Sequence, residues 1–227
     1  MKVLFNDRLL AGFDIARAMK YLHSHEYVHL FSIMIFMFLV RVLFNTCTHL
    51  FYFCAPHSIM YRDLKPENIG FDVRGNAKIF DFGLAKELID KDKVATDQYR
   101  ASGRTGTRRY MAPEVVLCKY YGKPADVFSF SILFWEILSL SQPFKGYDYE
   151  KHAKLVVLKK KRPELKNRWP AIIQMTMKEG WDDKPANRPP FDQICDSLSG
   201  QFTDDEGISR SERLRVLETS EHWRENS

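Results

Sequence analysis

Three short stretches of this chain combine residue types that could transfer a phosphoryl group. They are residues 61–68 (Tyr-Arg-Asp-Leu-Lys-Pro-Glu-Asn), 81–83 (Asp-Phe-Gly) and 112–114 (Ala-Pro-Glu). Asp63 could accept or orient the proton of a substrate hydroxyl, because it is a carboxylate. Asn68 and the carboxylate of the second stretch supply the oxygen ligands that Mg²⁺ prefers. The sequence therefore predicts magnesium-assisted phosphoryl transfer from ATP.

The spacing of these groups supports the same chemistry. Asp63 and Asn68 lie five positions apart in a loop that Pro66 stiffens. Asp81 follows thirteen positions after Asn68, at the end of a strand-like run at 77–80 (Ala-Lys-Ile-Phe). A loop followed by a strand end can direct one carboxylate at a hydroxyl and the other oxygen ligands at a metal.

In this order and spacing, the three stretches resemble the catalytic loop, the metal-binding loop and the end of the activation segment of eukaryotic protein kinases. The resemblance covers residues 7–25 and 58–200. It implies a protein-kinase-like fold, a mainly α large lobe with short β hairpins. No glycine-rich loop and no V-A-I-K-like run precede the catalytic loop, so we expect the small β lobe to be absent.

The resemblance implies a role for each chemical residue. Asp63 and Lys65 would be catalytic, with the Lys65 ammonium steadying the γ-phosphate and indicating a serine/threonine kinase. Lys65, Asn68 and Asp81 would bind ATP, and Asn68 and Asp81 would hold Mg²⁺. The alternatives without a catalytic role are a surface ion pair for Asp63, a solvated loop lysine for Lys65, and a turn-forming Asn68 and a strand-end Asp81 in a solvated loop.

Four further residues would have regulatory or structural roles in such a protein. Arg62 would pair with a phosphate on the activation segment. Thr107 would hydrogen-bond Asp63 and Lys65, and Glu114 would form an ion pair with Arg188. The candidate phosphate carriers, which the sequence does not rank, are Thr96, Tyr99, Ser102 and Thr105.

Three positions depart from the usual kinase pattern. Tyr61 stands where histidine is usual, and Ser131 replaces a common glycine. Gly70 replaces a leucine that forms the floor under adenine, a loss of about 1–2 kcal/mol of apolar contact if nothing replaces it. The amino-acid sequence at 126–130 and at 188–191 resembles that of the tyrosine-kinase-like group of serine/threonine kinases.

Several helices must position these residues. Residues 7–24 have apolar side chains at helical spacing, with Asp14, Arg17 and Lys20 available for the wet face. Residues 124–140 are almost continuously apolar and predict a buried central helix. The other predicted elements are a turn between strands at 72–76, a mobile polar segment at 84–111, and helices at 148–158, 170–179 and 190–198.

The predicted domain organisation divides the chain into 1–25, the supporting helix, 26–57, an apolar insert, 58–200, the catalytic large lobe, and 201–227, a charged tail.

Three interpretations of the apolar insert remain open: a transmembrane helix, a genuine lobe insertion, or translated non-coding sequence. The run from Leu30 to Val40 is shorter than the ~20 residues of a membrane span, and Arg41 would lie inside the bilayer. Non-coding sequence is favoured because removing 26–57 rejoins the helix to the catalytic loop in register.

Composition is that of an ordinary globular chain with 45% hydrophobic residues and a net charge of +5. The basic run at 159–162 is interpreted as a solvated helix end, so no nucleic-acid partner is expected. Four cysteines without C-x-x-C spacing and without a signal peptide predict reduced thiols in the cytoplasm.

The sequence thus predicts a serine/threonine protein kinase with an incomplete domain, inactive when isolated. Its ligands would be ATP and Mg²⁺, and its partner a protein substrate with Ser or Thr. The alternatives are a catalytically inactive kinase-like binding module and a membrane-tethered kinase fragment that uses residues 30–54.

Overall fold

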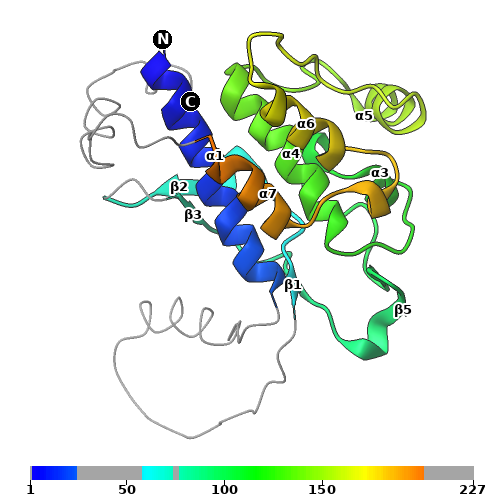
Figure 1. Cartoon of the computed structure of the whole chain (residues 1–227). Helices are drawn as coiled ribbons and strands as arrows, with labels where there is room; N and C mark the ends of the chain where they lie inside the picture. The colour runs from blue at the N-terminus through cyan, green and yellow to red at the C-terminus, as the bar shows by residue number, and fades with distance from the viewer. Residues whose placement is uncertain (1, 25–57, 74–76, 202–227) are drawn as a thin grey trace, which may run out of the picture.

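The computed structural model describes residues 2–24, 58–73 and 77–201, which form a mainly helical body with short strands along one side (Figure 1). Its α-helices are α1 (Lys2–His23), α3 (Pro113–Val116), α4 (Pro124–Ser139), α5 (Tyr149–His152), α6 (Ala171–Gly180) and α7 (Phe191–Ser199). Single turns of 3-10 helix are η1 (Pro66–Asn68), η2 (Asp90–Asp92), η3 (Arg108–Tyr110) and η5 (Pro185–Asn187), and η4 (Ala153–Leu158) is a π-helix.

The described strands pair into two-stranded antiparallel sheets. β1 pairs with β4, β2 with β3, and β5 with β6, with Ile59 opposite Glu87, Gly70 opposite Lys78, and Lys93 opposite Tyr99. The strands are β1 (Ile59–Met60), β2 (Ile69–Phe71), β3 (Ala77–Ile79), β4 (Lys86–Glu87), β5 (Lys93–Ala95) and β6 (Gln98–Tyr99). The β2–β3 pairing confirms the hairpin predicted around residues 72–76. The mainly α fold with short hairpins, predicted from the motifs, is confirmed.

Helix α1 packs along α4 and α7 and begins at Lys2, earlier than the predicted residue 7. A Cβ at Gly12 would collide with the ring of Phe134, so glycine allows α1 and α4 to approach closely. Arg17 is exposed as predicted, but Asp14 is buried, which corrects the prediction that it lies on the wet face. The reason is that β3 packs over this side of α1, where Asp14 Oδ2 accepts a 3.5 Å hydrogen bond from the Ala77 backbone N–H.

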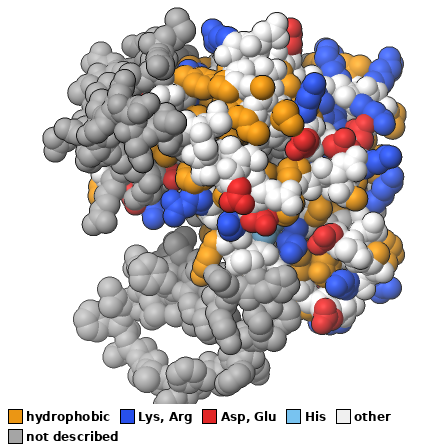
Figure 2. All heavy atoms as spheres, in the orientation of Figure 1, with side chains coloured by type: hydrophobic (Ala, Val, Ile, Leu, Met, Phe, Trp, Pro, Cys, Tyr) orange, Lys and Arg blue, Asp and Glu red, His pale blue; other side chains and the backbone are white. Residues whose placement is uncertain are grey.

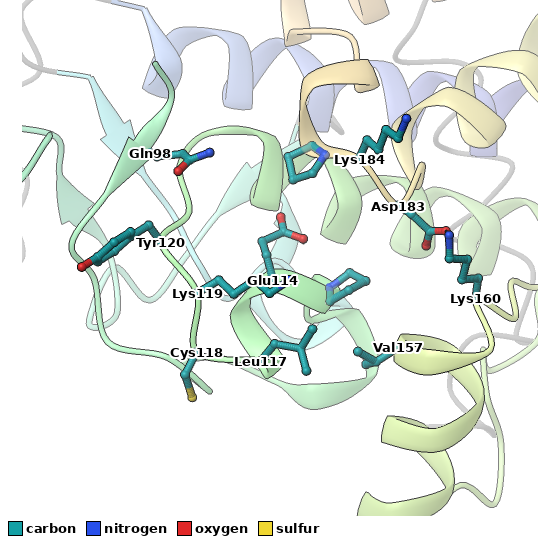
Figure 3. Close-up of a pocket in the computed structure, with 12 residues that line it drawn as sticks. Gln98, Glu114, Leu117, Cys118, Lys119, Tyr120, Val157, Lys160, Asp183 and Lys184 are labelled. Carbon is teal, nitrogen blue, oxygen red and sulfur yellow. The ribbon is translucent and has the colours of Figure 1, made fainter. Parts of the chain in front are cut away.

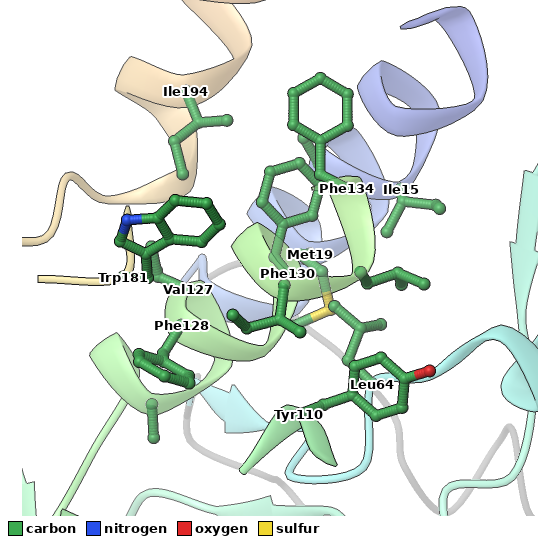
Figure 4. Packing of buried hydrophobic residues seen from close by; sticks show 14 of the residues in the cluster. Ile15, Met19, Leu64, Tyr110, Val127, Phe128, Phe130, Phe134, Trp181 and Ile194 are labelled. Atoms are coloured by element: carbon green, nitrogen blue, oxygen red, sulfur yellow. The ribbon is translucent and has the colours of Figure 1, made fainter. Parts of the chain in front are cut away.

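Helix α4 is the centre of the core (Figure 4). Pro124 begins the helix, where its missing N–H costs no hydrogen bond, and Leu140 ends it in a left-handed conformation (φ 53°). Phe130 stacks on Phe134 and meets Phe191 of α7 edge-on, each with ring centroids 5.4 Å apart. The predicted buried helix at 124–140 is therefore confirmed.

The three remaining predicted helices are present with small shifts in their ends. Residues 148–158 form α5 and then the wider π-helix η4, while 170–179 and 190–198 correspond to α6 and α7. The solvated-end interpretation of the basic run is wrong for Arg162. Its guanidinium is half-buried and bonds Asp183 at 2.7 Å and the carbonyl oxygens of Val156 and Trp181 at 2.9 Å.

Residues 84–111 contain more regular structure than the sequence predicted. The β5–β6 hairpin lies here, and Tyr99 N–H donates to Tyr121 O at 3.0 Å, joining the hairpin to the chain before α4. Arg100 N–H donates to Asp92 O at 2.8 Å and closes the turn. Thr and Ser pointed to a loop, but backbone pairing outweighed composition. The mobility predicted for this segment stays a prediction.

Some sequence predictions concern residues outside the described part. They are the insert at 26–57, the candidate span at 30–54 and nearly all of the tail at 201–227. Within residues 2–24, 58–73 and 77–201, no helix is long and apolar enough to cross a membrane. On the face drawn in Figure 2, Lys and Arg side chains lie among Asp and Glu side chains instead of gathering by sign.

Candidate active site

The predicted catalytic loop follows β1 and is fixed to the core by one buried carboxylate. Asp126 of α4 is 1% exposed and accepts hydrogen bonds from the backbone N–H groups of Tyr61 and Arg62, each at 2.8 Å. Arg62 has a left-handed backbone (φ 71°), which is unfavourable for a non-glycine residue unless its surroundings hold it. Asp126 therefore holds the loop in a conformation that it would not otherwise favour.

A third segment meets the same carboxylate. His23 Nε2, at the end of α1, lies 2.8 Å from Asp126 Oδ2, and the His23 ring packs edge-on against Phe191. Asp126 thus joins α1, the catalytic loop and α4. Neither Asp126 nor His23 was predicted from the sequence as a site residue. A carboxylate in the first turn of an almost continuously apolar helix was the available signal, since a buried charge requires partners.

Asp63 lies at the centre of the polar contacts of this loop. Lys65 Nζ is 2.7 Å from Asp63 Oδ2, and both the backbone N–H and the hydroxyl of Thr107 donate to Asp63 Oδ1 at 2.8 Å. Burial alone raises the pKa of Asp63, but the bonds from Lys65 and Thr107 outweigh it and lower that pKa. The carboxylate is therefore an anion at neutral pH, as a proton acceptor must be.

The same contact shifts the pKa of Lys65 in the opposite direction. Its hydrogen bond to Asp63 raises the pKa of the Lys65 ammonium, which keeps the positive charge beside the carboxylate. The predicted hydrogen bond from Thr107 to Lys65 does not occur among the described residues, because both donors of Thr107 are used by Asp63. That part of the prediction is corrected.

Asn68 and Asp81 offer oxygen atoms suited to a hard cation. Asn68 Nδ2 donates to Asp63 O at 2.9 Å and to Asp63 Oδ2 at 3.1 Å, so its amide oxygen is the end that turns away from Asp63. The Phe80 backbone N–H donates to Asn68 O at 2.8 Å and brings the end of β3 beside the loop. Asp81 is exposed and has a left-handed backbone (φ 54°). An amide oxygen and an exposed carboxylate fit Mg²⁺, which keeps few protein ligands.

Tyr61, which departs from the usual histidine, is fully buried and connects the loop to the metal-binding segment. Its hydroxyl donates to Phe80 O, and its ring meets Phe82 edge-on at 5.5 Å between centroids. Burial raises the pKa of this phenol above its ordinary value, so the hydroxyl keeps its proton and its donor role.

The Gly70 departure has a local counterpart. A Cβ at Gly70 would collide with the ring of Phe80, which lies over the glycine and is 49% exposed. Leucine would not fit here without moving that ring. The Phe80 ring therefore fills the space over Gly70, where the sequence predicted a loss of apolar contact.

The activation segment approaches the catalytic loop at Gly106. This glycine has φ 98°, and a Cβ on it would collide with the carbonyl oxygen of Arg62. No other residue type suits both conditions. Gly106 thereby places the next residue, Thr107, against Asp63.

Arg62 already contacts one of the four candidate phosphate carriers. Its guanidinium donates to Leu84 O at 2.5 Å, to Ser102 Oγ at 3.1 Å and to Tyr121 Oη at 3.4 Å. Ser102 Oγ also lies 2.8 Å from Thr105 Oγ1, and Tyr121 Oη donates to Ser102 O at 2.6 Å. The geometry therefore favours Ser102 over the other candidates, which sequence alone did not rank.

Glu114 and Arg188 come together although 74 positions separate them. Arg188 Nη1 and Nη2 donate to the two carboxylate oxygens of Glu114 at 2.6 and 2.9 Å, and both side chains are buried. Arg188 Nη1 also donates to Pro124 O at 2.8 Å. This forked pair fastens the end of the activation segment to the start of α4.

A hollow in the described residues lies away from these groups. It has a volume of about 810 Å³ and is lined by Leu117, Tyr120, Val157, Lys160 and Asp183, among others (Figure 3). Asp63, Asn68 and Asp81 do not line it. The candidate catalytic groups instead lie along the loops beside β1–β4, as described above.

Comparison with known proteins identifies the class. The protein kinase domain family matches residues 37–198, and the chain belongs to this family, whose members are ATP-binding transferases. The match starts inside the segment predicted as an insert and includes Asp63, Asn68 and Asp81. The predicted domain boundaries stay predictions, because residues 25–57 lie outside the described part.

The most informative relatives are also kinases. The chain is 36% identical to dual specificity protein kinase shkC of Dictyostelium discoideum over 146 residues, 64% of this chain and 28% of that protein. It is 50% identical to human ribosomal protein S6 kinase alpha-2 over 103 residues, 45% of this chain and 13% of that protein. The chain thus spans less than a third of the length of either relative.

Proposed function

We propose that this chain is the large lobe of a serine/threonine protein kinase that transfers the γ-phosphoryl group of ATP to protein hydroxyls. The observation that carries the proposal is the joint placement of Lys65, Asn68 and Thr107 around the Asp63 carboxylate. Such an arrangement combines a proton acceptor with a fixed cation, as phosphoryl transfer requires.

Each residue has a defined task in this proposal. Asp63 accepts or orients the proton of the substrate hydroxyl, and Thr107 holds the carboxylate in place. Lys65 stabilises negative charge on the transferred group. Asn68 and Asp81 would hold Mg²⁺, which neutralises the charge of the phosphate oxygens when bound.

Regulation is proposed to act through Arg62. A phosphate on Ser102 would lie within reach of a guanidinium that already donates to its hydroxyl at 3.1 Å.

The amino-acid sequence at 126–130 and 188–191 supports placement in the tyrosine-kinase-like group. The free thiols of Cys118 and Cys195 support a cytoplasmic location.

The test compares the full chain with a chimera that carries the small lobe of ribosomal protein S6 kinase alpha-2 in front of residue 2 and lacks residues 26–57. We expect negligible transfer of labelled phosphate by the full chain, because half of the nucleotide clamp is missing from it. The chimera should phosphorylate serine and threonine peptides, with a tyrosine peptide reporting dual specificity. Transfer by the full chain that Asp63→Asn abolishes would contradict the first expectation.

Substitutions in the chimera then separate the roles. Asp81→Ala should abolish turnover and weaken magnesium-dependent ATP binding, measured by calorimetry, whereas Asp63→Ala should abolish turnover and leave ATP affinity nearly unchanged. Lys65→Ala should lower turnover with a small change in ATP affinity. Equal weakening of ATP binding by Asp63→Ala and Asp81→Ala would refute the proposed division.

A further inference from the structure

Two arginines of the activation segment share one aromatic ring outside the catalytic contacts. The guanidinium carbons of Arg104 and Arg108 lie 5.6 and 4.8 Å from the ring centroid of Tyr149, the first residue of α5. Each contact is a favourable cation–π interaction. Together they place two like charges close to each other, which is unfavourable unless an anion lies nearby.

No such anion belongs to the described part of the chain. Among residues 2–24, 58–73 and 77–201, neither Arg104 nor Arg108 forms an ion pair, and Arg108 Nη1 is buried without a hydrogen-bond acceptor. The acids that flank Tyr149 along the sequence are Asp148, whose side chain caps α5 by accepting from Lys151 N at 2.7 Å, and the exposed Glu150. A buried guanidinium N–H without an acceptor is costly, so it marks a place for an external one.

His152, at the other end of α5 from Tyr149, supplies a second unsatisfied group. It is 2% exposed, and neither of its ring nitrogens has a hydrogen-bond partner in the described residues. Burial, then the positive charges of Arg108, Arg109 and Arg162, lower the pKa of His152 to about 4. The neutral ring still carries one N–H donor. Two arginines and a histidine thus offer donors with no internal acceptor.

The position of this cluster connects it to the substrate. Arg108 directly follows Thr107, which donates twice to the Asp63 carboxylate. Consecutive Cα atoms lie about 3.8 Å apart, so the Arg108 backbone lies next to Thr107 and close to Asp63. An extended peptide whose hydroxyl reaches Asp63 would therefore pass Arg108 within a few residues of that hydroxyl. The charge of the neighbouring Arg109 acts on His152 and also on the Glu136 carboxylate, which lowers the pKa of Glu136 against the effect of burial.

We propose that Arg104, Arg108 and His152 form a subsite for an acidic or phosphorylated side chain of the protein substrate, a few residues from the accepting hydroxyl. This inference rests on the proposed function and names the substrate class. Arginine suits it because its planar fork binds carboxylate and phosphate oxygens in pairs. The oxyanion would bond the orphaned Arg108 Nη1 and relieve the repulsion between the two guanidinium groups.

Peptide binding to the full chain tests the subsite without requiring catalysis. The probes are fluorescent serine peptides that carry glutamate, phosphoserine or alanine at one of the five positions on either side of the serine, measured by fluorescence anisotropy. We expect at least one acidic peptide to bind fivefold or more tightly than its alanine counterpart. Arg104→Gln combined with Arg108→Gln should remove that advantage. The matched control is Arg17→Gln, which removes an exposed arginine stacked on Phe13 at 5.8 Å and should leave the advantage intact.

The outcomes are distinct. A glutamate advantage identifies a carboxylate subsite, and an advantage for phosphoserine alone identifies a phosphate subsite for substrates that are already phosphorylated. Absence of any acidic advantage, or an advantage that survives the double substitution, overturns the proposal. Peptide binding with the expected preference, together with no transfer by the chimera, would instead refute the proposed function and leave the subsite standing.

Discussion

The helical half of the molecule and the segments that carry the candidate catalytic residues are stabilised in different ways. Helix α4 buries thirteen of its sixteen residues, among them four consecutive large apolar side chains at 132–135. The strand side is less uniform: both residues of β1 and the loop residues Tyr61 and Leu64 are buried, whereas all three residues of β5 are exposed, and Phe71 and Phe80 are 57% and 49% exposed. The difference indicates that the catalytic loop shares the helical core through Tyr61 and Leu64 and is fixed further by a few polar anchors, whereas the outer hairpins have no core of their own.

The sharpest test of this contrast replaces the same residue type in both halves. Phe130→Ala should lower the free energy of unfolding by about 3–5 kcal/mol, because it opens a cavity between Phe134 and Phe191. Phe80→Ala should cost less than about 1 kcal/mol, because half of that ring is exposed. Urea denaturation measures both. Equal losses would show that the strand side has a core after all.

The second test breaks the main anchor. Asp126→Ala should cost about 3 kcal/mol, because it leaves the buried N–H groups of Tyr61 and Arg62 without acceptors. Hydrogen exchange at those two amides should accelerate together. The control is Asp196→Ala on α7, where the aspartate is exposed and the cost should stay within about 0.5 kcal/mol. Unchanged hydrogen exchange at Tyr61 and Arg62 would show that the catalytic loop keeps its conformation without Asp126.

The third test weakens the anchor at the other end of the activation segment. Arg188→Lys keeps the charge but loses the fork that grips both oxygens of Glu114, so we expect a loss of about 2 kcal/mol. A double-mutant cycle with Glu114→Gln isolates the pair. A coupling energy near zero would assign the loss to the bonds that Arg188 makes with Pro124 O and Asp182 O.

The smallest expected effect is a pH dependence. The pKa of His152 is about 4 in the folded chain and about 6.5 when unfolded, so the unfolded state binds more protons between these values. Stability should therefore fall as pH drops from 7, by about 1 kcal/mol at pH 5.5. His152→Phe should remove this component while leaving those of Asp63, with its lowered pKa, and Glu136, with its raised pKa. Identical profiles of stability against pH for the unchanged chain and for His152→Phe would show that His152 makes no contribution to the pH dependence.

Much of the helical half was predictable because apolar periodicity reports burial directly. The helix at 124–140 could be placed from its side chains alone. The loop residues Asp63, Asn68 and Asp81 were assigned from the resemblance of their motifs to those of protein kinases. The anchors were not predictable in the same way. Nothing in the sequence spacing says that Asp126 meets the backbone of Tyr61, 65 positions earlier, or that Asp14 lies beneath β3.

The strand side was predicted least well, also for a physical reason. The β5–β6 hairpin has three exposed residues in its first strand, so the alternation that marks a half-buried strand is missing. The preference for Ser102 depends on a side-chain distance, 3.1 Å from Arg62, that composition cannot supply. Pairing between distant backbone segments and contacts of single side chains are the features that the sequence pattern leaves open.

The contacts of Asp126 also order the events of folding. The carboxylate joins His23, Tyr61 and Arg62, partners that lie 103, 65 and 64 positions away along the chain. Each of these contacts closes a long loop of chain, and the entropy of that closure must be overcome before the contact forms. The left-handed backbone of Arg62 is held by Asp126, so it depends on α4 being in place. During refolding, the helical core should therefore form before the catalytic loop reaches its final shape.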